Sequence, residues 1–316
     1  ELPARRRADP RAPGADAREA PGGVGAAAAM ALQALAAVLG GLAVLVALLR
    51  LFAADIYDVV IVWMTAQWYA AVFSRLRTGD RVLDVGIGTA TALVKNKTAL
   101  LERRLSVVGI DYEAAYVRKA EAVLRAADLW RPVPEGTEGY RKGEFYCRVL
   151  ERSIYDPGLG SLCTDEEGDR DPATVPEDKK FDAAYFSGSL TVMPNPTDAL
   201  KAVVPLLKAG SGRIYITQTF NKKRSSLIAV VKPLLKYITT IDFGQLTTEE
   251  DVKKIIADAG IFETVAYDKI EGSLDTPVQI ARLIVLKVKD GPGEAGGKAK
   301  ADGKAEDKAK AAANGR

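Results

Sequence analysis

The sequence predicts a doubly wound α/β domain whose core is a mostly parallel sheet of seven strands. Three features of residues 54–289 support this prediction. Short apolar runs alternate with helical segments, a glycine turn follows the first of these runs, and the last two runs have no helix between them. Alternation places successive strands parallel, with helices on both faces of the sheet. The two final runs predict an antiparallel hairpin at one edge.

The elements follow in a regular order. The first helix is apolar most of the way round and precedes the first strand. The strands are expected at 80–86, 106–111, 143–151, 181–187, 211–219, 262–269 and 277–288. The helices are expected at 56–76, 90–104, 112–127, 197–208 and 248–258.

Both ends of the chain differ from this domain in composition. Residues 1–29 are mainly Ala, Arg, Pro and Gly, so they are expected to be disordered or to form a targeting segment. A translation start at Met30 is the alternative, because residue 1 is Glu and Met30 is the first methionine. Residues 290–316 hold no large apolar side chain and are expected to form a disordered tail.

Residues 30–53 form a candidate transmembrane anchor. From Met30 to Leu49 the only polar side chain is Gln33. Such a helix, rising about 1.5 Å per residue, spans about 30 Å, the thickness of the hydrocarbon core of a bilayer. A buried helix of a soluble protein and a cleaved signal peptide are the alternatives. We therefore expect a membrane-anchored protein, with a cytoplasmic location as the alternative.

Composition excludes several kinds of chemistry. The chain has no histidine, which excludes a Ser-His-Asp triad, a histidine general base and a histidine-ligated zinc ion. Two cysteines, Cys147 and Cys163, are too few for a disulfide framework or a cysteine zinc site, so no metal is expected. A net charge of +3 is too even to indicate nucleic-acid binding.

The first strand leads into a glycine turn. Gly86 and Gly88 allow the backbone to pass close beneath a ligand, although a tight turn without a ligand gives the same pattern. A dinucleotide-binding turn would need a third glycine where the chain has Thr91, and Asp84 is foreign to it. With Asp84 included, residues 84–90 resemble the first motif of class I S-adenosylmethionine-dependent methyltransferases, with Ala90 at the third glycine position. In that family the loop surrounds the methionine part of the cofactor.

A second motif follows at the spacing of this family, 27 residues after Asp84. The apolar strand 106–111 ends in Asp111, and a helix begins directly afterwards. In dinucleotide and S-adenosylmethionine sites an acid at this position accepts hydrogen bonds from the two ribose hydroxyls. Capping the helix is the alternative role. Hydrogen bonds to a charged group are worth about 1.5–3 kcal/mol, so Asp111 should matter greatly for affinity.

The later motifs match the same family in the correct order over residues 79–220. The family's third strand ends at the adenine contact, where this chain has Ser153 and Ile154, and its fourth strand ends beside the transferred methyl, where this chain has Ser187 and Ser189. The pattern is most similar to the small-molecule group that includes the ubiquinone and menaquinone C-methyltransferases. The resemblance implies a Rossmann-like methyltransferase fold and S-adenosyl-L-methionine as the cofactor, bound by Asp84, Gly86, Gly88, Thr89, Asp111, Tyr112, Ser153, Ile154 and Ser187.

The acceptor side is less closely defined. Tyr57, Trp68 and Ser189 are the candidates for substrate binding, because the helix before the first strand often covers the pocket in the resembling family. Packing on the sheet or at a membrane interface is the alternative for the two aromatic residues. No catalytic residue is assigned, because methyl transfer depends on alignment and needs a base only when the acceptor must lose a proton.

Two segments carry concentrated charge. Residues 156–178 contain eight acids and one base, which predicts an acidic, solvated insertion. Residues 220–241 contain five bases and no acid among apolar residues. This basic segment is expected either to lie on an anionic membrane surface or to cap the acceptor pocket.

The sequence therefore predicts methyl transfer from S-adenosyl-L-methionine to a small acceptor by in-line displacement. The candidate anchor favours a lipophilic acceptor and a membrane partner, with no nucleic acid involved. The alternative is a catalytically degenerate binding or scaffold protein of the same fold at a membrane. A third hypothesis, an NAD-dependent enzyme, is disfavoured by Asp84 and Thr91.

Overall fold

The structure is a computed structural model that describes residues 23–164, 168–222 and 247–289. Within the long first helix, side chains are described at 28–45, at 47 and from 61 onward. The chain divides into two compact units, Glu1–Ala53 and Ala54–Arg316. The predicted tail at 290–316 lies outside the described residues, as does nearly all of the basic segment 220–241.

One continuous helix, α1 (Gly23–Phe73), replaces the two that the sequence predicts around 30–49 and 56–76. The join at residues 50–55 contains neither Gly nor Pro, so nothing in the sequence ends the first helix there. In the first unit, Ala28–Leu45 has a mean hydropathy of 2.1, and none of it is buried. Membrane anchors and signal sequences share this length and composition.

The second unit contains the predicted sheet. Within the described residues, seven strands form one sheet in the order β3-β2-β1-β4-β5-β7-β6. The first five pair in parallel, while β7 lies antiparallel between β5 and β6. The strands are β1 (Arg81–Val85), β2 (Ser106–Asp111), β3 (Cys147–Glu151), β4 (Ala183–Ser187), β5 (Arg213–Asn221), β6 (Phe262–Lys269) and β7 (Gln279–Val288). The predicted fold class and the antiparallel edge pair are confirmed.

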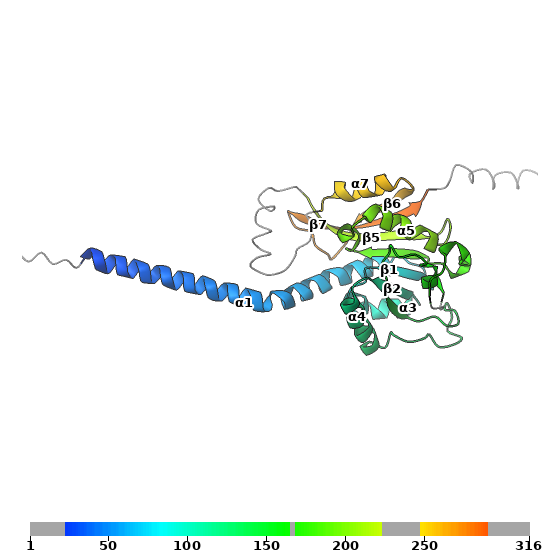
Figure 1. Ribbon diagram of the computed structural model, residues 1–316, viewed down its shortest axis with the longest axis horizontal. Coiled ribbons are helices and arrows are strands. Elements are labelled where there is room, and N and C mark those ends of the chain that lie inside the picture. The colour runs from blue at the N-terminus through cyan, green and yellow to red at the C-terminus, as the bar shows by residue number, and fades with distance from the viewer. Residues whose placement is uncertain (1–22, 165–167, 223–246, 290–316) are drawn as a thin grey trace, which may run out of the picture. The chain divides into compact units, whose positions relative to one another are not determined.

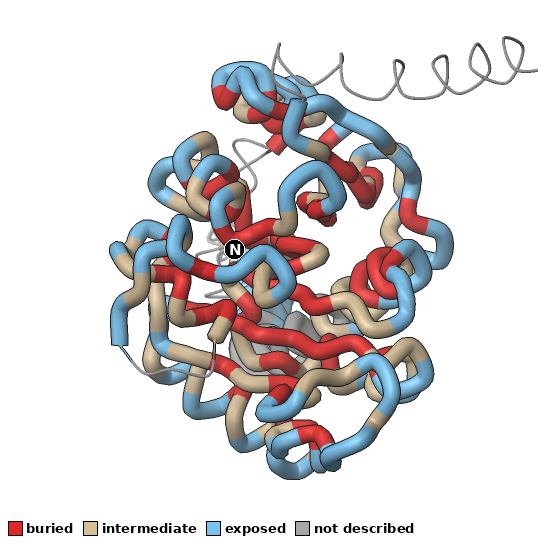
Figure 2. Tube along the Cα trace, turned by 90° about the vertical axis from the view of Figure 1, so that its right-hand side faces the viewer, coloured by how far each residue is buried: buried red, intermediate tan, exposed pale blue. Residues whose placement is uncertain are grey.

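Helices cover both faces of this sheet. Helices α5 (Pro196–Ala202) and α7 (Glu249–Ala259) pack on one face. The last turns of α1 pack on the other face with α2 (Thr91–Val94), α3 (Lys97–Glu102) and α4 (Ala114–Ala126). Figure 1 shows α5 and α7 on the side of the sheet opposite to α3 and α4. Buried residues gather in the interior of the fold (Figure 2), and the central strands β1, β2 and β4 are almost entirely buried.

Two predicted helices are shorter than expected. The segment 90–104 divides into α2 and α3 at Asn96, whose side-chain amide donates to the carbonyl oxygens of Ala92 and Ala66. The segment 197–208 contains Pro205, which has no N–H to donate, and α5 is followed by a short 3₁₀ helix, η5 (Val204–Leu206).

The insertion 156–178 is more than an acidic solvated loop. Its described part forms three short 3₁₀ helices, η1 (Gly160–Cys163), η2 (Pro172–Thr174) and η3 (Glu177–Lys179). Apolar side chains of this insertion are buried in the core beside α5: Leu159, Leu162, Cys163 and Val175. The number of acids predicts only that the segment has a solvated surface. The apolar side chains between the acids are what pack it against the core.

The glycine turn packs directly on the neighbouring strand. Ile87 lies over Gly109 of β2, and a Cβ at Gly109 would lie 2.5 Å from Ile87 Cδ1 and 2.9 Å from its Cγ2. Ile87 is itself 7% exposed, so it has little space into which it can move. The missing side chain at Gly109 therefore sets how closely the turn approaches the sheet.

Gly109→Ala should destabilise the protein by about 1–3 kcal/mol through overpacking. The measurement is the midpoint of thermal or urea unfolding of the full chain. Ile87→Ala also costs stability, by creating a cavity. The double variant should lose less stability than the sum of the two single variants, because the shorter side chain at position 87 leaves space for the methyl group added at position 109. Strictly additive losses would contradict the proposed contact.

Candidate functional site

A cavity of about 690 Å³ opens at the carboxyl ends of the parallel strands. The strand order reverses between β1 and β4, the position at which doubly wound sheets bind ligands. The volume lies within the range of small-molecule sites. Its described lining comes from the ends of β1 to β4 and the loops that follow them: Val85, Gly86, Gly88, Ile110, Asp111, Tyr112, Tyr116, Arg152, Ser153, Ile154, Tyr155, Ser187, Gly188, Ser189, Val192, Met193 and Pro194.

The glycine turn forms the floor of this cavity. Three of its residues have left-handed backbone, with φ of 76° at Gly86, 60° at Gly88 and 55° at Ala90. Ala90 thus adopts a conformation that favours glycine, at a cost of about 1–2 kcal/mol. A Cβ at Gly86 would lie 2.7 Å from Ser189 Cβ, whereas a Cβ at Gly88 would meet nothing within 4 Å. Gly86 therefore permits close packing, and Gly88 leaves its backbone open to the cavity.

The Asp111 carboxylate is held by two backbone N–H groups. Its Oδ2 accepts from Gly88 N and its Oδ1 accepts from Glu113 N, each at 3.0 Å. The residue is 7% exposed and lines the cavity. Each oxygen keeps a further lone pair, so the carboxylate can accept two more hydrogen bonds. Glu113 is the N-cap residue of α4, so the alternative role of Asp111 as the cap of this helix is wrong, and its remaining acceptor capacity is left for a ligand.

The predicted adenine-side residues also reach the cavity. Ile154 is buried and presents an apolar surface, while the Ser153 N–H donates to Asp156 Oδ2 at 2.8 Å. Tyr112 is 78% exposed at the mouth. Ser187 and Ser189 line the opposite side, at the end of β4. The lining therefore combines aromatic and apolar side chains with a few hydroxyl groups.

Three predicted site residues, Asp84, Thr89 and Trp68, do not line the cavity. The Asp84 side chain is fully buried, and Thr89 instead shares a hydroxyl hydrogen bond with Thr91. The Trp68 indole is 3% exposed and donates to Ser273 Oγ at 2.9 Å, and its ring packs beneath Gly188. The side chain of Tyr57 lies outside the described residues.

Several lining residues carry no sequence motif and were not predicted. They follow the ends of β2, β3 and β4, so the general rule that ligands bind at the carboxyl ends of strands is the signal that could have found them. They are Tyr116, Arg152, Tyr155, Val192, Met193 and Pro194. Among the described residues, no group of three Asp, Glu or Cys side chains is placed to hold a metal ion.

No family model and no curated protein matches the chain. Solved structures do resemble it at low identity. An arsenic(III) S-adenosylmethionine methyltransferase from Chlamydomonas reinhardtii is 18% identical, with a TM-score of 0.40. The match covers 68% of this chain and 65% of that protein. An S-adenosylmethionine-dependent methyltransferase from Aquifex aeolicus is 15% identical with a TM-score of 0.44, covering 73% of this chain and 97% of its own.

The [4+2]-cyclase SpnF is also similar, at 13% identity and a TM-score of 0.47, with 71% of this chain and 82% of that one covered. One fold supports many reactions, so function has to be argued from the site.

Asp84 is a buried carboxyl group in β1, the strand that leads to this site. Its Oδ2 accepts a hydrogen bond from the Tyr69 hydroxyl of α1 at 2.5 Å, while Oδ1 has no partner among the described residues. Burial raises the pKa of Asp84 to about 7, the Tyr69 hydrogen bond opposes this shift, and the charge of Asp111 adds to it. Burial and the adjacent carboxylate also raise the pKa of Tyr69. Between about pH 4 and pH 7, the pair therefore holds a proton that the unfolded chain has released.

Asp84→Asn should change how stability depends on pH. An unfolded Asp loses its proton near pH 4, so the wild-type carboxyl stabilises the fold fully below about pH 4 and loses this contribution as pH rises through about 7. The melting temperature of the variant minus that of wild type should therefore increase from acid to neutral pH. Asp268→Asn, at an exposed acid, is the control. A pH-independent difference for Asp84→Asn would show that Asp84 does not carry this proton.

Proposed function

We propose that the protein transfers a methyl group from S-adenosyl-L-methionine to a small lipophilic acceptor. The observation that carries the proposal is the Asp111 carboxylate, which is fixed at the cavity wall by the N–H groups of Gly88 and Glu113 and has acceptor capacity left over. A fixed carboxylate beside an open glycine turn matches a ligand that presents a vicinal diol and an adjacent charged chain.

The residues present fit this cofactor. Asp111 would accept hydrogen bonds from the ribose hydroxyls, and the backbone of Gly86 and Gly88 would pass beneath the methionine part. Tyr112, Ser153 and Ile154 would border the adenine, and Ser187 would lie toward the reacting end. Asp84 and Thr89 would support the turn from outside the cavity. The similarity of residues 79–220 to the methyltransferase motifs supports this assignment.

The chemistry asked of the chain is modest. The bound sulfonium supplies an activated methyl group, so the protein has to align the acceptor and exclude water. Among the described lining residues the only carboxylate is Asp111, which is already engaged by two N–H groups. We therefore propose an acceptor that needs no carboxylate base among these residues, such as a phenol that binds as its phenolate.

Two features support a lipophilic acceptor. The rim includes Val192, which is 69% exposed, together with Met193 and Pro194, and no charged side chain lies among them. The apolar segment Ala28–Leu45 fits a bilayer, so we propose a membrane anchor at 30–53 and a catalytic domain at 54–289. Such an anchor would keep the domain where lipophilic molecules concentrate.

Asp111→Asn should weaken binding of S-adenosylmethionine and S-adenosylhomocysteine by roughly ten- to a hundredfold, because an amide can accept only part of the ribose hydrogen bonding. The measurement is calorimetric titration of the full chain, with NAD as a third ligand and Glu113→Gln as the matched control. Glu113 carries the same charge two residues away but does not line the cavity. Absence of binding to folded wild type would favour the scaffold alternative, and binding of NAD alone would contradict the assignment of the glycine turn.

Val192→Asp should raise the KM for a lipophilic acceptor roughly tenfold, because the apolar contact is replaced by a charge that must be desolvated. The measurement compares transfer of a labelled methyl group to a prenylated phenol in detergent with transfer to the same phenol lacking the prenyl chain. Only the first KM should change. Val278→Asp is the control, since Val278 is 51% exposed and does not line the cavity. Equal changes for both phenols would contradict an apolar acceptor rim.

A further inference from the structure

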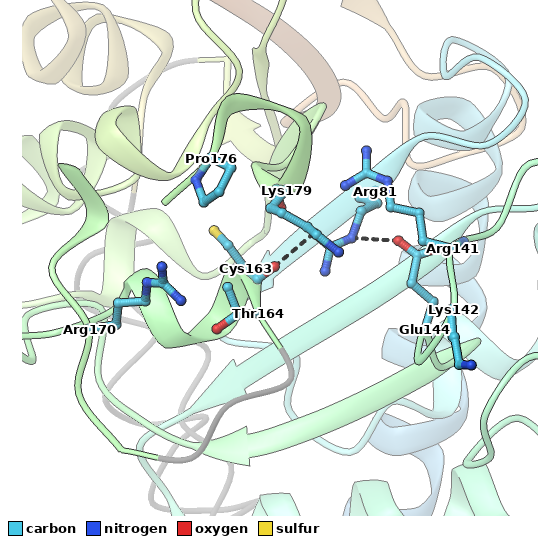
Figure 3. A pocket seen from close by; sticks show the side chains of 9 residues that line it. All are labelled: Arg81, Arg141, Lys142, Glu144, Cys163, Thr164, Arg170, Pro176 and Lys179. Carbon is cyan, nitrogen blue, oxygen red and sulfur yellow. Dashed lines mark hydrogen bonds and ion pairs between the residues drawn. The ribbon is translucent and has the colours of Figure 1, made fainter. Parts of the chain in front are cut away.

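A second cavity, of about 430 Å³, lies near the amino ends of the central strands. The proposed methyl-transfer cavity lies at their carboxyl ends. Arg81 begins β1, Glu144 lies in the loop before β3, and Lys179 precedes β4. Cys163 and Thr164 come from the end of η1. Figure 3 shows Arg81, Arg141 and Lys179 gathered on one side of this cavity, with Arg170 on the other side beyond Cys163 and Thr164. Its described lining is completed by Lys142 and Pro176.

The charge of this lining is strongly one-sided. Its described residues carry five cationic side chains and a single carboxylate, Glu144. That carboxylate is already engaged on both oxygens, since Oε1 pairs with Arg81 Nε at 3.0 Å and Oε2 accepts from Arg141 N at 2.9 Å. Arg81 and Glu144 are both more than nine-tenths buried, so this ion pair belongs to the permanent structure. The described lining is therefore rich in cationic side chains and poor in acids.

Two buried polar atoms of the lining have no hydrogen-bond partner within the part of the chain that the structure describes. Arg141 Nη1 and Thr164 Oγ1 are both shielded from solvent, and neither has a hydrogen-bond partner within the described residues. Buried polar atoms in folded proteins are almost always paired, and leaving a charged one unpaired is especially costly. Both atoms are suited to a phosphate, whose oxygens accept from guanidinium and hydroxyl groups.

The remaining lining residues are held by other contacts. Arg81 Nη1 donates to the carbonyl oxygens of Cys163 and Lys179, which fixes its guanidinium in the wall. Lys142 pairs with Glu135 at an exposed position, and Arg170 contacts Thr174. Burial raises the pKa of Cys163 to about 11, so its thiol stays protonated and is not a nucleophile. The cavity is thus arranged for binding an anion and not for covalent chemistry.

We propose that this cavity binds the phosphate group of a small soluble phosphate ester, with Arg141 as the principal contact and Thr164 as a second donor. The volume exceeds that needed for a bare phosphate and matches a small ligand. Arginine is the side chain best suited to such a group, because its planar guanidinium can donate two parallel hydrogen bonds. This site is separate from the proposed methyl-transfer cavity and does not depend on that function.

Binding can be measured as the change in melting temperature of the full chain on addition of inorganic phosphate or glycerol 3-phosphate, with sodium chloride at equal ionic strength as reference. Both should raise the melting temperature beyond the salt effect, glycerol 3-phosphate more strongly. Arg141→Gln should weaken binding roughly tenfold or more. Arg125→Gln, which removes the same charge from an exposed ion pair on α4, should leave binding unchanged.

Glu144→Gln should change phosphate affinity in the direction opposite to Arg141→Gln. Removing the only carboxylate of the described lining should strengthen phosphate binding, even though the free protein loses its pairing with Arg81 and melts at a lower temperature. Absence of any phosphate effect in wild type would overturn the proposal, as would an undiminished effect in Arg141→Gln.

The chain itself offers a competing anion. Asp165, Glu166 and Glu167 follow Thr164 in the sequence and lie outside the described residues. A variant with Asn or Gln at these three positions separates the two sources of negative charge. Phosphate binding in wild type supports an external ligand. Binding that emerges only in the neutralised variant would overturn it and assign the cavity to the chain's own acids.

Discussion

The Asp111 carboxylate joins the three segments from which the first cavity is built. It ends β2, accepts the N–H of Gly88 in the glycine turn, and accepts the N–H of Glu113 directly before α4. A carboxylate with charge-assisted bonds to two backbone groups restrains all three segments at once. The same charge faces the cavity, so the group that orders the walls also determines what they can bind. Structure and recognition therefore depend on one side chain here.

A second carboxylate, on the neighbouring strand β1, has a different purpose. Asp84 lies one strand away from Asp111, but it is fully buried and takes its hydrogen bond from Tyr69 of α1. Tyr69 also packs edge-on against Tyr185 of β4, with ring centroids 5.0 Å apart. Because burial favours the protonated form of Asp84, this contact ties α1 to the sheet without placing a full charge in the core. The two acids of the sequence motifs thus have separate roles, one inside the cavity wall and one behind it.

The sequence predicted the features that depend on local pattern. The strands β2 and β6 have the predicted bounds, and Asp111 lies where the motif spacing put it, because apolar runs and turn residues act over a few positions. Features that depend on contacts between distant segments could not be predicted from the sequence. The Ile87 contact with Gly109, the burial of Trp68 against Ser273 and the bend at Asn96 all require knowledge of which segments meet. The basic cavity is the clearest case, since residues from 81 to 179 converge on it without a shared motif.

The two cavities lie at opposite ends of the same strand. Arg81 begins β1 and lines the basic cavity, and Val85 ends β1 and lines the other. All five residues of β1 are buried, and the strand is paired on both sides. At about 3.3 Å per residue the strand holds the two sites farther apart than the distance over which neighbouring changes couple. An anion bound to Arg141 would therefore stabilise the folded domain while leaving the shape of the glycine turn, and hence the affinity of the first cavity, essentially as it is.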